Sequence, residues 1–236
     1  MLSPSGELSA LKVTRAGEGR YLVELLTPQE GVWQLELLAQ GLYGLQPLAQ
    51  LSFTRGAQRL SSSYALETIE TIEERLTAEQ ATERLFALIQ EARLKRGLEA
   101  LKLDETLTRL STQHAHEMAQ EGYLGHRSPS KGSPRARLEQ SGYVALKSGE
   151  NIALNPTIKG AHERLMWSLG HRRNLLDAQF THLGLATQRT PLGWLVVETF
   201  AQAAPRYSAA QLPQLKDELQ VKLAQSIWGE KTALKT

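Results

Sequence analysis

The chain concentrates its candidate chemistry between Gly125 and Asn174, in the pieces Gly125-His126, Gly149-Glu150-Asn151-Ile152-Ala153 and Ser168-Leu169-Gly170-His171-Arg172. Each piece joins glycine to a histidine or a carboxylate, and glycine lets backbone approach closely. Taken singly, His126 reads as a loop histidine, Glu150 as a solvated strand edge and His171 as a charge at a helix end. Taken together, the three side chains suggest one site assembled from distant parts of the chain.

The segments around this stretch have the apolar spacing of helices and of one β-hairpin. Helical spacing covers about 77–97, 104–122, 133–142 and 157–169, and Thr77, Asp104 and Ser133 are suited to begin the first three helices. From 183 to 200 the apolar residues follow a period of two, interrupted by the turn residues Pro191 and Gly193. We therefore expect four helices followed by a hairpin.

Residues 1 to about 60 have the pattern of β-strands instead. In 31–37, Trp33, Leu35 and Leu37 alternate with polar residues, and 8–14, 20–26 and 48–54 are further candidate strands. The closely spaced glycines favour a small sandwich or barrel. We interpret 1–75 as a β-rich accessory domain and linker without a catalytic constellation, 76–205 as the domain that carries the site, and 206–236 as a C-terminal helix capped at Ser208.

Composition narrows the possible function classes. The chain has 236 residues, of which 41% are hydrophobic and 22% charged, as in a soluble globular protein. A net charge of +2 without a basic, aromatic-rich stretch argues against nucleic-acid binding, and no apolar run reaches the length of about 18 residues that a membrane span needs. Because there is no cysteine, a metal ion would need histidine and carboxylate ligands. Residues 1–6 lack the basic and apolar segments of a signal peptide, so we expect either a cytoplasmic protein or a chain whose export signal has been removed.

The remaining histidines and the basic residues near the site have structural or solvent-facing interpretations. The segment from His116 to Gln120 lacks the second histidine of a zinc-protease helix, and His162 is expected to face solvent. A basic cluster surrounds the candidate site in the sequence, and it is either a solvated face or a rim that attracts anionic ligands. Its members are Arg127, Lys131, Arg135, Arg137, Arg172 and Arg173.

A longer series of motifs runs in a fixed order from about residue 82 to residue 201. Its pieces are Gln90-Glu91-Ala92-Arg93, His114-Ala115-x-x-Met118-Ala119, Gly122-Tyr123-x-x-His126, Ser133-Pro134-x-x-Arg137-Leu138, Gly142-Tyr143, Gly149-Glu150-Asn151-Ile152-Ala153, Ser168-x-Gly170-His171-Arg172-x-Asn174-Leu175-Leu176, Phe180-Thr181-x-x-Gly184 and the strand 194–200. In this order they resemble the CAP superfamily of cysteine-rich secretory proteins, antigen 5 and pathogenesis-related 1 proteins, also called SCP domains. The resemblance is greatest to the shorter bacterial branch.

The resemblance implies an α+β fold: a CAP-type α/β/α three-layer sandwich with an antiparallel sheet and an open cleft, preceded here by the small all-β domain. Members often hold two histidines and two glutamates in the cleft, sometimes with zinc or another divalent cation. His126, Glu150 and His171 match three of these positions and are the candidate metal ligands. Where the second glutamate would fall, this chain has Trp167-Ser168. The predicted cleft residues are thus His126, Glu150, His171, Ser168 and Asn151.

The resemblance also implies a protein that is secreted, periplasmic or associated with the cell envelope. We expect non-enzymatic binding of a lipid-like ligand or of a partner through the cleft. One alternative is a metal-dependent hydrolase or protease that uses His126 and His171 as metal ligands and Glu150 as a third ligand or base. Another is a structural adhesion module that binds a protein partner through the N-terminal β domain. An apolar groove between helices would favour the lipid binder, and a metal with a reactive water would favour the hydrolase.

Overall fold

The computed structural model describes residues 1–7, 9–18, 20–42, 44–57, 76–205, 210–211, 213–220 and 222. Two compact units, Met1–Ala203 and Ala204–Thr236, are described separately. In the second unit 213–220 is helical, whereas the predicted cap Ser208 lies outside the described residues. The predicted boundary between residues 75 and 76 borders the segment 58–75, which also lies outside them, so the division into domains stays a prediction. Within the described part of the chain, no helix is both long and apolar enough to cross a membrane.

A four-stranded sheet forms the middle layer of residues 76–205. Its strands are β5 (Lys102–Leu103), β6 (Ala145–Asn155), β7 (His182–Thr190) and β8 (Gly193–Ala203), in the order β5-β7-β8-β6. Strands β7 and β8 are the predicted hairpin, and β6 pairs with β8 in antiparallel fashion. Only the short β5 pairs in parallel, with β7. The antiparallel sheet expected from the resemblance is therefore confirmed, with a two-residue parallel edge.

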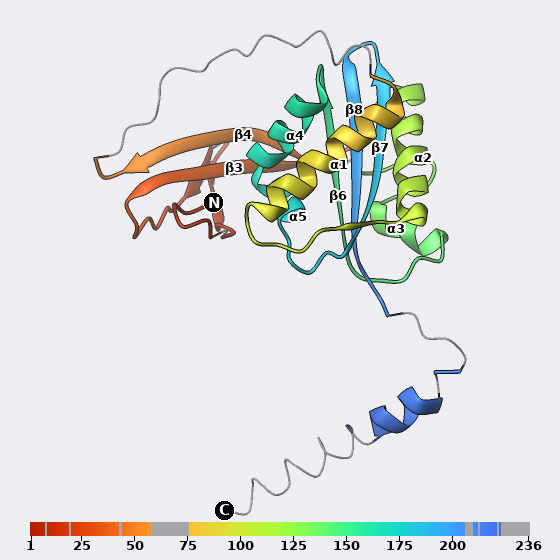
Figure 1. Cartoon of the computed structure of the whole chain (residues 1–236). Helices are drawn as coiled ribbons and strands as arrows, with labels where there is room; N and C mark the ends of the chain where they lie inside the picture. Colours follow the sequence, from red (N-terminus) through yellow and green to blue (C-terminus); the bar gives the residue numbers. More distant parts are fainter. Residues whose placement is uncertain are drawn as a thin grey trace, which may run out of the picture. The chain divides into compact units, whose positions relative to one another are not determined.

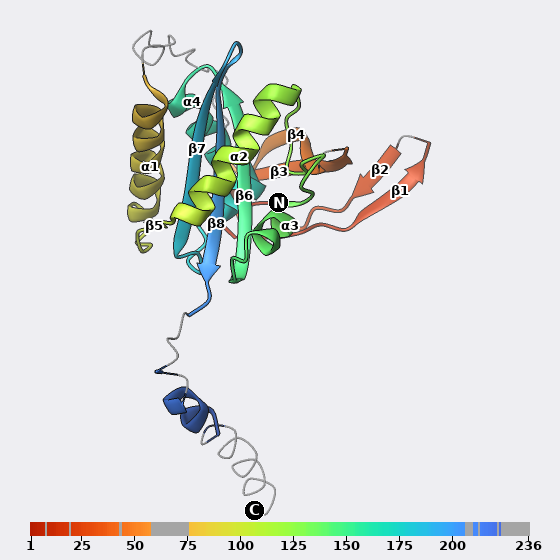
Figure 2. The same cartoon turned by 90° about the vertical axis from the view of Figure 1, so that its right-hand side faces the viewer.

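Helices cover both faces of this sheet (Figures 1 and 2). On one side lie α1 (Ala78–Leu94), α4 (Ile158–Trp167) and α5 (Leu169–Leu175), and on the other lie α2 (Glu105–Glu121) and α3 (Pro134–Gln140). Alternate residues of β8 supply the two cores: Trp194, Val196 and Phe200 join the α1–α4 core, while Leu195 and Val197 join the α2 core. Because both faces of β8 are buried, its sequence is a nearly continuous apolar run. The predicted three-layer α/β/α sandwich is confirmed.

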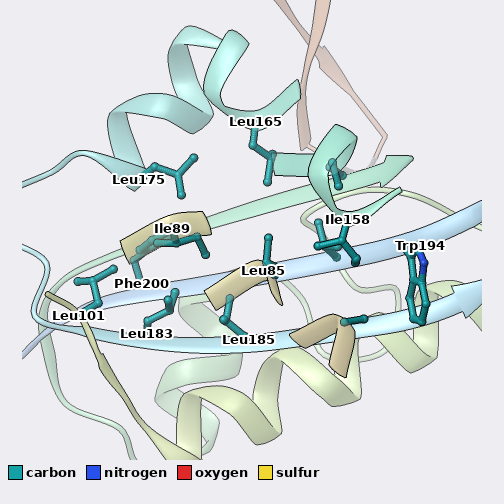
Figure 3. Close-up of a cluster of buried hydrophobic side chains, with 14 of the residues drawn as sticks. Leu85, Ile89, Leu101, Ile158, Leu165, Leu175, Leu183, Leu185, Trp194 and Phe200 are labelled. Atoms are coloured by element: carbon teal, nitrogen blue, oxygen red, sulfur yellow. The ribbon is translucent and has the colours of Figure 1, made fainter. Parts of the chain in front are cut away.

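The larger core lies between α1, α4 and the sheet (Figure 3). Leu85 and Ile89 on α1 face Leu183 and Leu185 on β7, and all four side chains are buried to within 1% exposure. On the opposite face, α2 lies so close to β7 that a Cβ at Gly184 would be 2.1 Å from the backbone carbon of Leu107. Glycine is required at this position because any side chain would separate helix and sheet.

Local capping signals place the helix starts where the sequence predicts them. Thr77 and Gln80 form the capping box of α1, Asp104 caps α2, and Ser133 caps α3 ahead of its proline. The single helix predicted over 157–169 is wrong in one respect. Ser168 has extended backbone (φ −70°, ψ 126°), which ends α4 and lets α5 begin at the next residue.

The N-terminal part consists of two antiparallel hairpins. Strands β1 (Val13–Gly17) and β2 (Arg20–Val23) form one, and β3 (Gly31–Gly41) and β4 (Gly44–Arg55) form the other. They are separate two-stranded sheets among the described residues, not the sandwich or barrel that the glycine spacing favoured. Large apolar side chains stay outside, including Leu22 at 65% and Leu26 at 74% exposure. The second hairpin instead contacts the segment around Ser168, as described below.

Candidate functional site

The loop after α2 and strand β6 bring an imidazole and a carboxylate together. His126 Nδ1 donates a hydrogen bond to Glu150 Oε1 at 3.0 Å. Arg137, on α3, forms an ion pair with the other oxygen of Glu150 and donates to the carbonyl of His126 at 2.8 Å. The Glu150 side chain is 3% exposed, so both of its oxygens are engaged inside the protein.

This pairing keeps Glu150 ionised. Burial by itself would raise the pKa of the Glu150 carboxyl, but the hydrogen bond from His126 and the charge of Arg137 together hold that pKa below its usual value. An ionised carboxylate accepts only, so Nδ1 of His126 carries a proton and is the donor in this hydrogen bond. The arrangement fixes the orientation of the His126 ring.

His171 faces this pair from the start of α5. The ring centroids of His126 and His171 are 6.3 Å apart. Burial, assisted by the nearby His126 and opposed by the carboxylate of Glu36, lowers the pKa of His171 to about 4. His171 is therefore a neutral imidazole at physiological pH.

Asn151 holds the backbone on which these groups depend. Its Nδ2 donates to the carbonyl of His171 at 3.1 Å and to Glu198 Oε2 at 2.8 Å, while its Oδ1 accepts from Asn174 Nδ2 at 2.9 Å. With all of these contacts internal, Asn151 acts as a positioning residue that ties β6 to α5.

Ser168 meets a residue from the N-terminal part. Its Oγ donates to Glu36 Oε1 at 2.7 Å, and the amide of Gly170 donates to Glu36 Oε2 at 3.0 Å. Nearby, Arg172 donates to Gln34 Oε1 at 3.1 Å. A carboxylate from strand β3 therefore lies where the helix is interrupted, and the interruption frees both Ser168 and Gly170 to bind it.

A cavity of about 510 Å³ opens beside His171 and Ser168. Ala153 of β6 and Leu165 and Trp167 of α4 give it apolar walls. Ala49 and Gln50 of β4 close it from the N-terminal hairpin, and Arg164 adds a positive charge. Trp167 is 49% exposed, as expected for a residue on the lip of an accessible cavity. The size and lining are those of a small-molecule site.

The predicted metal ligands do not fit a three-ligand cation site in this arrangement. Among the described residues, no three His, Cys, Asp or Glu side chains gather closely enough to hold one metal ion. Glu150 already accepts hydrogen bonds on both oxygens, and a cation there would have to compete with Arg137. His126 and Glu150 form a hydrogen-bonded pair instead, and the His171 ring lies 6.3 Å from the His126 ring.

Three contributors to the site were missed by the sequence interpretation. Arg137 was grouped with solvated basic residues, but it is 4% exposed and pairs with Glu150. Its position directly before the buried Leu138 on a short helix was the available signal. Glu36 and Gln50 lie in a part of the sequence that showed no constellation, and their alternation with apolar residues made them look solvent-facing.

His162 and Glu198 are buried titratable groups outside this cluster. His162 is 7% exposed, so the expectation that it faces solvent is wrong; burial lowers its pKa to about 4. Glu198 lies fully buried on β8, where burial raises the pKa of its carboxyl to about 8 although the hydrogen bond from Asn151 opposes this. Both groups are neutral at pH 7 and serve packing, because a charge at these depths would be costly.

Sequence comparison identifies relatives of one segment. Residues 86–200 match the model of CAP, the cysteine-rich secretory protein family. From Bacillus subtilis (strain 168), the uncharacterized protein YkwD is 35% identical over 103 residues, and the uncharacterized membrane protein YlbC is 34% identical over 108 residues. These matches cover 43% and 45% of this chain but only 40% and 31% of the relatives. The chain thus spans less than half the length of either relative.

Solved structures with a similar fold come from other bacteria. An extracellular protein containing a SCP domain from Bacillus anthracis str. Ames has a TM-score of 0.50 at 19% identity, covering 83% of this chain and 68% of that one. An outer surface protein from Borrelia burgdorferi has a TM-score of 0.50 at 17% identity, covering 55% and 97%. At these identities the likeness is one of fold. The family model agrees with the motif order and the solved structures share the fold, so residues 86–200 of this chain are a CAP domain.

Proposed function

We propose that this chain is a non-enzymatic binding protein that holds a lipid-like small molecule in the cleft of its CAP domain. One observation carries the proposal: a cavity of about 510 Å³ lies beside a polar cluster whose carboxylate is already satisfied within the protein. A general base or metal-bound carboxylate needs an oxygen that can reach substrate or metal. Both oxygens of Glu150 are already bonded within the protein, whereas the cavity has space and apolar walls for a ligand.

The walls favour an amphipathic ligand. Ala153, Leu165 and Trp167 present apolar surface, and each methylene removed from water against such surface stabilises a complex by about 0.8 kcal/mol. The polar residues that line the same cavity are Gln50, Glu163, Arg164, Ser168 and His171. A molecule with an apolar body and a polar end matches both sets of groups.

We infer a location outside the cell or at the cell envelope. The support is that the two solved relatives with a similar fold are an extracellular protein and an outer surface protein. Lipid-like compounds are available to a protein at that location, because membranes and envelope material surround it.

Binding of the fluorescent amphiphile 1-anilinonaphthalene-8-sulfonate, with dodecanoate as competitor, tests this function. The full chain should bind the dye saturably and release it to dodecanoate. Trp167→Ala should weaken both affinities about tenfold, because an aromatic wall is lost. Leu192→Ala is the matched control, since Leu192 is an apolar residue that is 73% exposed in the β7–β8 turn. No saturable binding by the unmodified chain, or equal effects of the two variants, would contradict the proposal.

The metal-dependent hydrolase is the second candidate, and one observation favours it. Glu150 orients the His126 ring by accepting a hydrogen bond from Nδ1, as carboxylates do for metal-binding histidines. Zinc would supply a Lewis acid or an activated water if it bound. The adhesion alternative stays a prediction that concerns the exposed apolar residues of the N-terminal hairpins.

A further inference from the structure

The second N-terminal hairpin forms part of the cleft wall. Strands β3 and β4 lie beside α4 and α5 (Figure 1), and Glu36 stands directly opposite Gln50 in their register. Ser168 and Gly170 of the CAP domain both donate to the carboxylate of Glu36. Charge-assisted hydrogen bonds of this kind are stronger than neutral ones, so Glu36 fixes the hairpin at the cleft.

Gln50 is held by the same carboxylate. Its Nε2 donates to Glu36 Oε1 at 2.8 Å and also lies 3.4 Å from the carbonyl of Trp167. Both partners are acceptors, so the amide nitrogen must face them and the orientation of the side chain is determined. Its carbonyl oxygen, Oε1, has no hydrogen-bond partner among the residues that the structure describes. Because Gln50 also lines the cavity, this oxygen is the acceptor that a ligand would find.

The neighbouring groups define the rest of the ligand. Arg164 supplies a positive charge on the cavity wall, and Glu163, the acidic residue on the same wall, pairs with Lys159 at 3.6 Å, so Arg164 suits the carboxylate of a ligand. Ala153, Leu165 and Trp167 suit an apolar tail. An N–H group between tail and carboxylate would pair with Gln50. These three features occur together in an N-acyl amino acid, where an amide N–H separates an acyl chain from a carboxylate.

We propose that Gln50, positioned by Glu36, accepts a hydrogen bond from the ligand N–H group in the CAP cleft. The hairpin and the CAP domain then form one composite site for N-acyl amino acids. The proposal rests on the proposed function, because it requires that the cavity binds a small amphipathic molecule. It adds the ligand class and a residue from outside the CAP domain.

Two acylated probes that differ by one methyl group test the role of Gln50. N-dodecanoylglycine carries the amide N–H, whereas N-dodecanoylsarcosine has a methyl group in its place and cannot donate. Displacement of the bound dye from the full chain should show the glycine compound binding about tenfold more tightly, the effect of one hydrogen bond left unpaired at the site. In Gln50→Ala this ratio should fall to about one, because the acceptor is absent from both complexes.

Two measurements test whether Glu36 positions Gln50 and the hairpin. Glu36→Ala should reduce the probe ratio as the change at Gln50 does, and it should speed hydrogen exchange of the Gly170 amide, which loses its acceptor. Glu24→Gln removes a carboxylate from an exposed position of the same part of the chain and should change neither quantity. Unchanged methyl resonances of Leu183 and Leu185 in the core would show that each variant is folded.

The outcomes separate the two proposals. If the chain binds dodecanoate but binds the two acyl probes equally, the role of Gln50 is wrong and the binding function stands. If Gly170 exchanges at the same rate with and without the Glu36 carboxylate, the hairpin is not held as described and the composite site is wrong. If none of the dye, dodecanoate and acyl probes binds, the proposed function fails, and the ligand class fails with it.

Discussion

Ser168 Oγ donates a 2.7 Å hydrogen bond to Glu36 Oε1 across 132 positions of the sequence. This contact joins the CAP domain to the N-terminal hairpin at the point where helix α4 is interrupted. It brings a carboxylate from outside the domain to the edge of the cleft. The cavity beside it therefore has walls from both parts of the chain.

Ser168→Ala should lower the free energy of unfolding by about 1 kcal/mol, because it removes one hydrogen bond to a charged group that is partly screened by solvent. Glu36→Gln should have a similar effect. The double variant should lose less than the sum of the single losses, since both changes break the same contact. Urea unfolding of the four proteins measures this coupling, and strictly additive losses would show that the contact contributes nothing.

Arg137→Met should cost about 3–5 kcal/mol, because it leaves the carboxylate of Glu150 buried without its cationic partner. Arg135→Ala is the matched control: Arg135 lies on the same helix, is 84% exposed and pairs with the exposed Glu139. That change should stay within about 0.5 kcal/mol. Equal losses in thermal or urea unfolding would mean that the Glu150–Arg137 pair is not buried as described.

Glu198→Gln should remove a pH dependence of stability. The pKa of Glu198 is about 8 in the folded protein and 4.5 as the reference value, so the folded state binds this proton more tightly than the unfolded chain does. The contribution of the Glu198 carboxyl to the free energy of unfolding is therefore fully present below pH 4.5. It is lost as pH rises towards 8, at up to about 1.4 kcal/mol per pH unit. Glutamine is neutral throughout. The variant should thus become the more stable protein as pH rises, and parallel stability curves for the two proteins would refute the assignment.

Zinc should not occupy the cluster as a tight one-to-one ligand, because Glu150 is committed to His126 and Arg137. Calorimetric titration of the metal-stripped protein with zinc should give no saturable heat that depends on the two histidines. The double variant His126→Ala, His171→Ala should therefore give the same titration curve. A stoichiometric signal that this variant abolishes would instead support the hydrolase and justify assays for hydrolysis.

Much of the fold could be predicted because its signals are local. The capping box of Thr77 and Gln80 and the cap at Asp104 are hydrogen bonds within three residues, so their spacing is visible in the sequence. The alternation along 194–200 likewise reports burial residue by residue. The order of the motifs then identified the layers of the CAP domain correctly.

The site was only partly visible because its decisive contacts are not local. His126, Glu150 and His171 were found through their glycine-rich surroundings. Arg137 binds a residue 13 positions away, and Glu36 binds one 132 positions away. The periodicity of a sequence carries no information about contacts between residues so far apart. A polar residue that alternates with leucine gives the same pattern whether its side chain faces water or a second domain. The break at Ser168 was missed for the same reason.

The most direct test of the central claim is an NMR titration of the full, methyl-labelled chain with N-dodecanoylglycine. The account predicts saturable shifts at the methyl groups of Ala153 and Leu165, which line the cavity, and at the side-chain amide of Gln50. The methyl groups of Leu107 and Leu138, buried on the opposite face of the sheet, should stay unchanged. Shifts confined to residues outside the cavity, or no saturable shift at all, would contradict the claim that this cleft is a ligand-binding site with a wall from the N-terminal hairpin.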